Sequence, residues 1–330
     1  MSLFKLTIEG IDRTTTVQNR LIDLSLTDKR GLEADELSLT LSDHDAALPL
    51  PTKGNTIQLW LAAPDSQLVN MGSYVIDEAE HSGSPDQMTI KAKSADMKGT
   101  LKVKRSESHH RTSMGDLARK YADRHQLQLS ISDEVAAIPI SHLDQTRESD
   151  MNVLSRLARE HDLVATVKQG RLTVIKAAQG KSASGRALPS ITLTRASGDQ
   201  HRYSRADRNT DYDGATASYH DPKTGKTETI HVDQQGKTQT SIHKPLLLSK
   251  PAASAEQAKT RATAKAQQVK RQVATFELTL ATGRPDIKPE TPIRVQGFRP
   301  YIDQHRWTTE EVTHRLSGSG YQTVIKLESA

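Results

Sequence analysis

The sequence predicts a mainly β protein that carries a small α+β insert. Short segments that alternate apolar and polar side chains recur at both ends of the chain, separated by turn residues. Between these ends, residues 101–178 contain two helical patterns among further strands. A chain of 330 residues has room for about two or three domains, and its 35% of hydrophobic residues predict small cores with much solvated or partner-covered surface.

Residues 1–100 predict a small antiparallel barrel or sandwich. Every second residue is leucine in the centre of residues 35–43, which is typical of a half-buried strand. The prolines of residues 48–51, followed by Gly54, predict a stiff connection. Further strands are expected at residues 3–10, 17–27, 57–61, 72–77 and 88–92.

Residues 101–178 predict a compact α+β unit. A helix is expected after Ser113, and a second helix after Ser149, because a serine hydroxyl can accept a hydrogen bond from a free backbone N–H of the first turn. Apolar residues at three- and four-residue spacing follow Ser149. Strands are expected at residues 127–131, 163–167 and 172–175, the last two joined by a turn at residues 168–170.

Residues 179–330 begin with a polar linker and return to strand patterns. Strands are expected at residues 191–193, 213–219, 227–232, 275–280, 293–298, 307–314 and 321–327, with a hairpin loop at residues 220–226. Ser254 and Gln257 form a capping-box pattern that opens a helix over residues 254–273.

The apolar stripe of that helix consists of small side chains, so it either lies close on a barrel or packs against another subunit. Its candidate interface residues are Ala255, Ala258, Ala262, Ala266, Lys259, Arg261 and Lys265. The basic side chains could also contact phosphate groups. A solvated outer face is the simpler interpretation.

Composition excludes several classes of site. The chain has no cysteine, so it can form neither a disulfide nor a thiolate metal site. No apolar run approaches the roughly 20 residues that span a bilayer, and residues 1–5 lack a signal-peptide core, so we expect synthesis in a cytoplasm. The net charge of +5 comes from interspersed basic and acidic residues and does not require a nucleic-acid partner.

No group of residues predicts catalysis, a cofactor or a metal ion. His109 and His110 would point to opposite faces of a strand and could not chelate one ion together, so we expect them in an exposed loop. Glu310, Glu311 and His314 lack the second histidine of a zinc helix, and we expect them at a solvated strand end. Asp43 and Asp45, and likewise His220 and Asp221 with Ser218 close by, are set in predicted turns without visible pocket residues.

The order of residues resembles a known family. Gln145, Glu148, Ser149 and Asp150 stand in a Gln-x-x-Glu-Ser-Asp pattern before Leu-Ser-Arg-Leu-Ala. The Leu-Pro-x-Pro-x-x-Gly connection at residues 48–54 and a Gly-x-Pro-x-Ile-x-Pro run from Gly283 appear in the family's order. With these motifs the chain resembles, over nearly its whole length, the phage late control D proteins. This is the contractile-tail baseplate hub group, related to the hub part of VgrG spike proteins. Where the family often has glycine after the helix, this chain has His161 and Asp162.

The resemblance implies a fold and an assembly. It implies two tail-tube-like antiparallel β-barrels, over residues 1–100 and 179–330, and a middle domain over residues 101–178, with strands free to interleave across these boundaries. It implies a non-enzymatic homotrimer, a pseudo-hexameric ring that joins the six-fold tail tube to the trimeric central spike. Baseplate wedge and tape-measure proteins are further candidate partners. No cofactor, membrane or specific nucleic acid is implied.

The expected location is the baseplate of a virion or tail-like particle, assembled in the host cytoplasm. Because the chain stops at Ala330 without a repetitive β-helix, we expect the spike on a separate polypeptide. Two alternatives stay open. A cell-wall-binding or wall-degrading tail protein would need a cleft with paired carboxylates, and a nucleic-acid-binding protein would use the basic helix 254–273 and release DNA at high salt.

Overall fold

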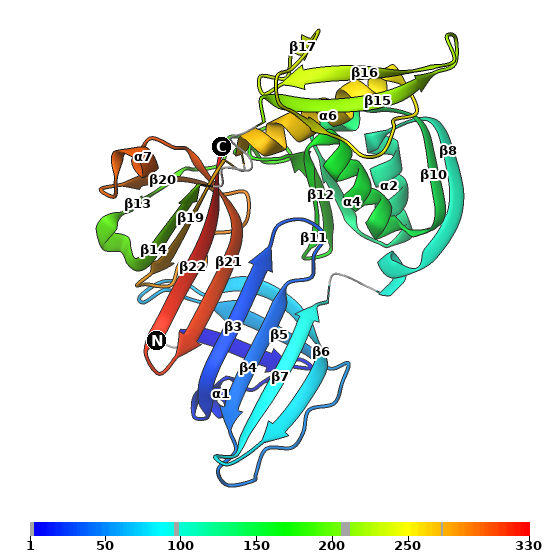
Figure 1. Ribbon diagram of the computed structural model, residues 1–330. Helices are drawn as coiled ribbons and strands as arrows, with labels where there is room; N and C mark the ends of the chain where they lie inside the picture. Colours follow the sequence, from blue (N-terminus) through cyan, green and yellow to red (C-terminus); the bar gives the residue numbers. More distant parts are fainter. Residues whose placement is uncertain (1–2, 96–98, 206–211, 272) are drawn as a thin grey trace.

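The computed structural model describes residues 3–95, 99–205, 212–271 and 273–330. Figure 1 shows one long twisted sheet in two halves, with an insert and a smaller helix-and-sheet lobe beside it. The mainly β class with an α+β insert is confirmed. None of the helices in these described ranges is long and apolar enough to cross a membrane.

The large sheet runs in the order β14-β19-β22-β21-β3-β4-β7-β6-β5-β1-β2, and β20 and β13 extend it beside β21. The first half holds β1 (Phe4–Ile8), β2 (Ile11–Asp12), β3 (Leu21–Lys29), β4 (Glu36–Ser42), β5 (Thr56–Leu61), β6 (Val69–Ser82) and β7 (Gln87–Ser94), with helix α1 (Thr14–Gln18). The second half holds β13 (Ile191–Thr194), β14 (Gly198–Arg205), β19 (Ala274–Leu280), β20 (Pro292–Gln296), β21 (Trp307–Ser317) and β22 (Gly320–Ser329), with helix α7 (Pro300–Asp303).

The two predicted tail-tube-like β-barrels are found as the two halves of the large sheet, but neither half is a closed barrel. Glu311–Ser317 of β21 pair with Asp23–Lys29 of β3, so the halves form one continuous sheet. Within the described residues the path has open ends, and each half keeps its own core. Backbone pairing between segments almost 300 positions apart is a long-range contact, and no local pattern in the sequence predicts it.

The insert surrounds a third core. It contains η1 (Gly99–Lys102), β8 (Lys104–Ser113), α2 (Met114–Arg124), β9 (Gln128–Ile131), α3 (Asp133–Ala136), β10 (Pro139–Ser149), α4 (Asp150–His161), β11 (Leu163–Lys168) and β12 (Arg171–Lys176). Strands β8 and β10 form a two-stranded antiparallel ribbon on one side of α2 and α4 (Figure 1). Neither ribbon strand is predicted above, because their sequences are mostly polar.

A fourth core lies under helix α6 (Ala255–Arg271). This helix packs on the sheet of β15 (Gly214–Asp221), β16 (Lys226–Asp233), β17 (Thr238–Gln239) and β18 (Pro245–Leu247). The predicted hairpin loop joins β15 to β16. Residue 272, which belongs to the predicted helix 254–273, lies outside the described residues.

The predicted helix starts are confirmed by their hydrogen bonds. The Ser149 hydroxyl accepts from the Asn152 N–H at 3.2 Å, and the Ser113 hydroxyl accepts from the Asp116 N–H at 3.1 Å. Ser254 does the same for the Gln257 N–H at 3.2 Å. The strand predicted at residues 17–27 is shorter, because its first residues belong to α1.

Candidate functional site

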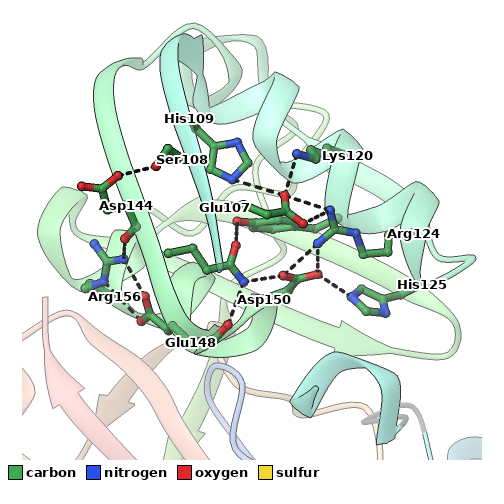
Figure 2. Close-up of polar contacts among 12 residues, drawn as sticks. Glu107, Ser108, His109, Lys120, Arg124, His125, Asp144, Glu148, Asp150 and Arg156 are labelled. Atoms are coloured by element: carbon green, nitrogen blue, oxygen red, sulfur yellow. Dashed lines mark hydrogen bonds and ion pairs between the residues drawn. The ribbon is translucent and has the colours of Figure 1, made fainter. Parts of the chain in front are cut away.

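The Gln-x-x-Glu-Ser-Asp motif builds a buried polar network at the start of α4. Asp150 is 1% exposed and accepts hydrogen bonds from the Arg124 guanidinium at 2.9 and 3.1 Å. Its carboxylate also lies 2.9 Å from Nε2 of His125 and accepts from the Gln145 amide at 2.7 Å. Figure 2 shows Arg124 and His125 pointing toward Asp150 from the C-terminal end of α2. Gln145 belongs to β10.

Electrostatics keep Asp150 ionised. Burial alone raises the pKa of a carboxyl group, because it disfavours the charged form. Here the hydrogen bonds from Gln145, His125 and Arg124 outweigh burial, and the pKa of Asp150 lies below its ordinary value. The carboxylate is therefore a fixed negative charge that joins α2, β10 and α4.

The other motif residues each have a structural role. The Gln145 amide also donates to the Glu148 carbonyl at 2.8 Å, and its oxygen accepts from the Tyr121 hydroxyl at 3.0 Å. Glu148 binds the guanidinium of Arg156, in the middle of α4, at 2.7 Å. The ribbon register shifts between Gln145 and Glu148, which is a β-bulge that turns the chain into the helix.

A second charged centre joins this network at Glu107 of β8. Its carboxylate binds Lys120 at 2.7 Å and Arg124 at 2.7 Å, both from α2 (Figure 2). The Lys120 and Arg124 contacts lower the pKa of Glu107 to about 2 against a smaller effect of burial. Arg124 thus bridges two carboxylates, Glu107 and Asp150, and fixes the ribbon to both helices.

Ion pairs also join the insert, the α6 lobe and the large sheet. Asp162 ends α4 in the left-handed conformation, with φ of 55°. Its carboxylate binds the guanidinium of Arg271 at the end of α6. Arg271 lies 3.5 Å from Glu328 of β22, and Arg30 binds Glu328 at 2.6 Å.

This chain of charges continues into the sheet at Glu290. Nε of Arg30 lies 2.6 Å from Glu290, which also accepts a hydrogen bond from the Ala178 N–H at 2.7 Å. Burial raises the pKa of Glu290, and the attraction of Arg30 opposes that rise. The positive charge of Arg30 therefore stabilises two buried carboxylates, Glu290 and Glu328, which are 6% and 4% exposed.

A separate clamp fixes the β11–β12 turn to the first half of the sheet. Lys168 binds Asp28 and lies 3.2 Å from Asp35. Burial and the neighbouring Asp28 raise the pKa of Asp35 to about 6, while Lys168 acts in the opposite direction. Sequence reasoning missed these contacts, because they join residues more than 130 positions apart.

Comparison with known proteins places this arrangement in a family. Residues 33–320 match the family described as "Phage tail baseplate hub (GPD)". The chain belongs to the phage tail baseplate hub family. The resemblance stated from the sequence is confirmed.

Two relatives support the assignment, and one solved structure shares the fold. The hub is 39% identical to the probable baseplate hub protein of Escherichia phage 186 and 36% identical to that of Escherichia phage P2. Each alignment covers 98% of this chain and 92% of the relative. The fold is similar to the 43 kDa tail protein of prophage MuSo2 from Shewanella oneidensis, with a TM-score of 0.72 at 15% identity, over 98% of this chain and 97% of that chain.

The candidate interface residues on α6 of the hub have different environments. Ala258, Ala262 and Ala266 are fully buried against β15 and β16 of the same chain. Arg261 binds Glu160 of α4 at 2.6 Å, and Lys265 lies 3.5 Å from the Gln268 amide oxygen. Ala255 and Lys259 are exposed, and their contact with a partner stays a prediction.

The histidines of the hub that could suggest chemistry are also placed. The expected exposed loop at His109 and His110 is corrected, because both residues belong to strand β8. His109 is buried edge-on against Tyr121, whereas His110 is exposed beside His142. His314 corrects the prediction of a solvated strand end: it is 0% exposed on the core face of β21, where its Nδ1 lies 2.9 Å from the Tyr321 hydroxyl and 3.2 Å from the Thr323 hydroxyl. Burial lowers the pKa of His314 to about 4, so it is neutral in the core.

The carboxylates and the hairpin have local structural roles. Asp45 binds Arg20 at 2.6 Å, and Asp43 accepts from the Leu48 N–H at 2.9 Å. Asp221 caps its own hairpin loop by accepting from the Lys223 N–H at 2.9 Å. Among the residues that the structure describes, no group of three or more His, Asp or Glu side chains is arranged to hold a metal ion.

Proposed function

We propose that three copies of this hub form a ring of near six-fold symmetry that connects the tail tube to the central spike of a phage or tail-like particle. One observation carries the proposal: the two halves of the large sheet repeat each other. The order β3-β4-β7-β6-β5-β1 in the first half corresponds to β14-β19-β22-β21-β20-β13 in the second. The two orders differ only in the direction of their last pair: β1 pairs antiparallel with β5, whereas β13 pairs parallel with β20.

The repeat extends to single residues. Residues 74–81 and 307–314 correspond without a gap, from the buried aromatic side chains of Tyr74 and Trp307 to His81 and His314. Both segments have a β-bulge in the middle, and both bulges are followed by a glutamate that binds a lysine across the strands. These pairs are Glu78 with Lys91 at 3.2 Å and Glu311 with Lys326 at 2.6 Å.

A duplicated half explains how a three-fold object can match a six-fold one. Three chains with two equivalent halves each supply six similar units around one axis. A ring of this kind fits the tube on one side and a trimeric spike on the other. The relatives from phages 186 and P2 are named as probable baseplate hub proteins, which supports this place in the tail.

The remaining parts of the proposal concern location and partners. We assign residues 1–100 and 179–330 to the ring-forming part and residues 101–178 to the insert beside it. The partners are the spike and tube proteins, with wedge and tape-measure proteins as further contacts. Assembly takes place in the bacterial host cytoplasm, and the function is architectural.

Light scattering on the purified chain at moderate salt tests the stoichiometry. The expected mass is three times 36.4 kDa. A stable dimer would contradict the proposal, because two-fold symmetry cannot supply six equivalent units from duplicated halves.

A further inference from the structure

We infer that β6 of one subunit pairs antiparallel with β14 of the next subunit, in a register that the chain's own β21–β3 junction sets. The inference rests on the proposed ring. It concerns the two free strand edges of the large sheet, at opposite ends of the β14-to-β6 path (Figure 1). Within the described residues, β14 pairs only with β19. The second part of β6, residues 77–82, pairs only with β7.

Strand directions allow these edges to meet. Every pairing along the path β14-β19-β22-β21-β3-β4-β7-β6 is antiparallel. Because this path contains an even number of strands, β6 and β14 run in opposite directions. When copies are related by rotation about an axis along the strands, the β6–β14 contact is therefore antiparallel too, and the sheet closes without an edge.

The β21–β3 junction within one chain is the template. The first residues of β21 pair with β20, and after a bulge between Thr309 and Glu311 the strand pairs with β3. β6 follows the same course: its first part pairs with β5, and a bulge lies between Ile76 and Glu78. In the repeat, β6 corresponds to β21 and β14 corresponds to β3. The strand expected beside the second part of β6 is therefore a β14, and in a ring this β14 belongs to the next subunit.

The exposure of the two corresponding histidines supports this interpretation. His314, on a strand that pairs with β3, is 0% exposed, whereas the side chain of His81, on the free edge of β6, is 45% exposed. A neighbouring strand on β6 would reduce the exposure of His81. The polar sequence of β14, with Arg202 and Arg205 exposed, keeps this edge soluble before assembly.

The register follows from the internal pairs. In the chain, His314 stands opposite Leu26 and Thr313 opposite Thr27. Leu26 pairs with Leu37 of β4 as Tyr203 pairs with Phe276 of β19, in equivalent positions of the two halves. The expected pairs between subunits are His81 with Tyr203, Glu80 with Ser204, Ala79 with Arg205 and Ser82 with Arg202.

This register is chemically consistent. Glu80 and Arg202 are diagonal neighbours on one face, close enough for long side chains of opposite charge to meet. Both are exposed, and neither forms an ion pair with another described residue. Glu80 and Ser204 replace Thr313 and Thr27, whose hydroxyl oxygens lie 3.2 Å apart within the chain.

Cysteine cross-linking tests the register, because the natural chain has no cysteine. The variant carrying Glu80→Cys and Ser204→Cys should form disulfide-linked dimers and trimers on mild oxidation, since directly opposite strand residues meet the distance requirement. A mixture of the two single variants should give dimers alone. Thr27→Cys with Thr313→Cys is the matched positive control and should link within one chain. Glu80→Cys with Tyr203→Cys places the thiols on opposite faces and should not link.

The outcomes separate this inference from the proposed ring. A trimeric mass without cross-links in the Glu80→Cys and Ser204→Cys variant, while the positive control links, overturns the β6–β14 contact and leaves the ring standing. Cross-links of equal yield in the Glu80→Cys and Tyr203→Cys variant overturn the register. A chain that forms no trimer, alone or with its spike protein, contradicts the ring and this contact together.

Discussion

Replacement of Asp150 by alanine is expected to destabilise the hub by about 3–5 kcal/mol, the usual cost of removing one partner from a buried, hydrogen-bonded charge pair. The substitution leaves the Arg124 guanidinium, His125 and the Gln145 amide without their common acceptor. Urea unfolding followed by circular dichroism measures the loss. A loss below 1 kcal/mol would show that the network does not stabilise the fold.

Asp144→Ala is the matched control for Asp150→Ala. Asp144 lies on β10, the strand that leads into α4, but its side chain is 56% exposed, and its contacts are with the surface residues Ser108 and His142. We expect a change within about 0.5 kcal/mol. The pH dependence has a definite sign: because the folded pKa of Asp150 is lowered, its contribution is complete above about pH 4 and is lost as the pH falls toward the folded pKa. The difference between wild type and Asp150→Ala should therefore shrink only in strong acid.

Arg30→Met is expected to cost a similar amount, about 3–5 kcal/mol at pH 8. Methionine keeps most of the side-chain volume but leaves Glu290 and Glu328 buried without the charge that lies 2.6 Å from each. Arg271 still reaches Glu328, at 3.5 Å, so Glu290 carries most of the penalty. The free energy of unfolding from urea titrations checks this value.

Acid should rescue the Arg30→Met variant. Burial already raises the pKa of Glu290, and loss of Arg30 removes a contact that lowers it. The folded variant then takes up a proton at a higher pH than the unfolded chain, so its stability rises relative to wild type as the pH falls from 8 to 5. The control is Arg284→Met, which breaks a half-exposed pair with Asp286 and should cost less than about 1 kcal/mol at both pH values. An Arg30→Met deficit that does not change with pH would contradict the assigned role of Glu290.

Local chemistry accounts for the parts of the fold that the sequence predicts correctly. The helices that start after Ser149 and Ser254 carry an N-cap and periodic apolar residues, and the loop before β16 carries proline and glycine. These signals lie within a few residues of each other. They need no knowledge of the rest of the chain.

The missed parts depend on distant residues. β14 carries few apolar side chains, because it lies at an open edge, and its sequence does not resemble a core strand. In the sequence Asp150 is only a member of the Gln-x-x-Glu-Ser-Asp pattern, whereas the structure gives it Arg124 and His125 as partners. The correspondence between residues 74–81 and 307–314 is present in the sequence, but the two segments have few identical residues. The strand order makes it evident.

Imaging of the purified assembly by electron cryomicroscopy tests the central claim most directly. Averaged views along the axis should show a closed ring with six similar units, three-fold symmetry and three outer projections formed by the inserts. An assembly with two-fold symmetry, or an open filament in place of a ring, would contradict the account.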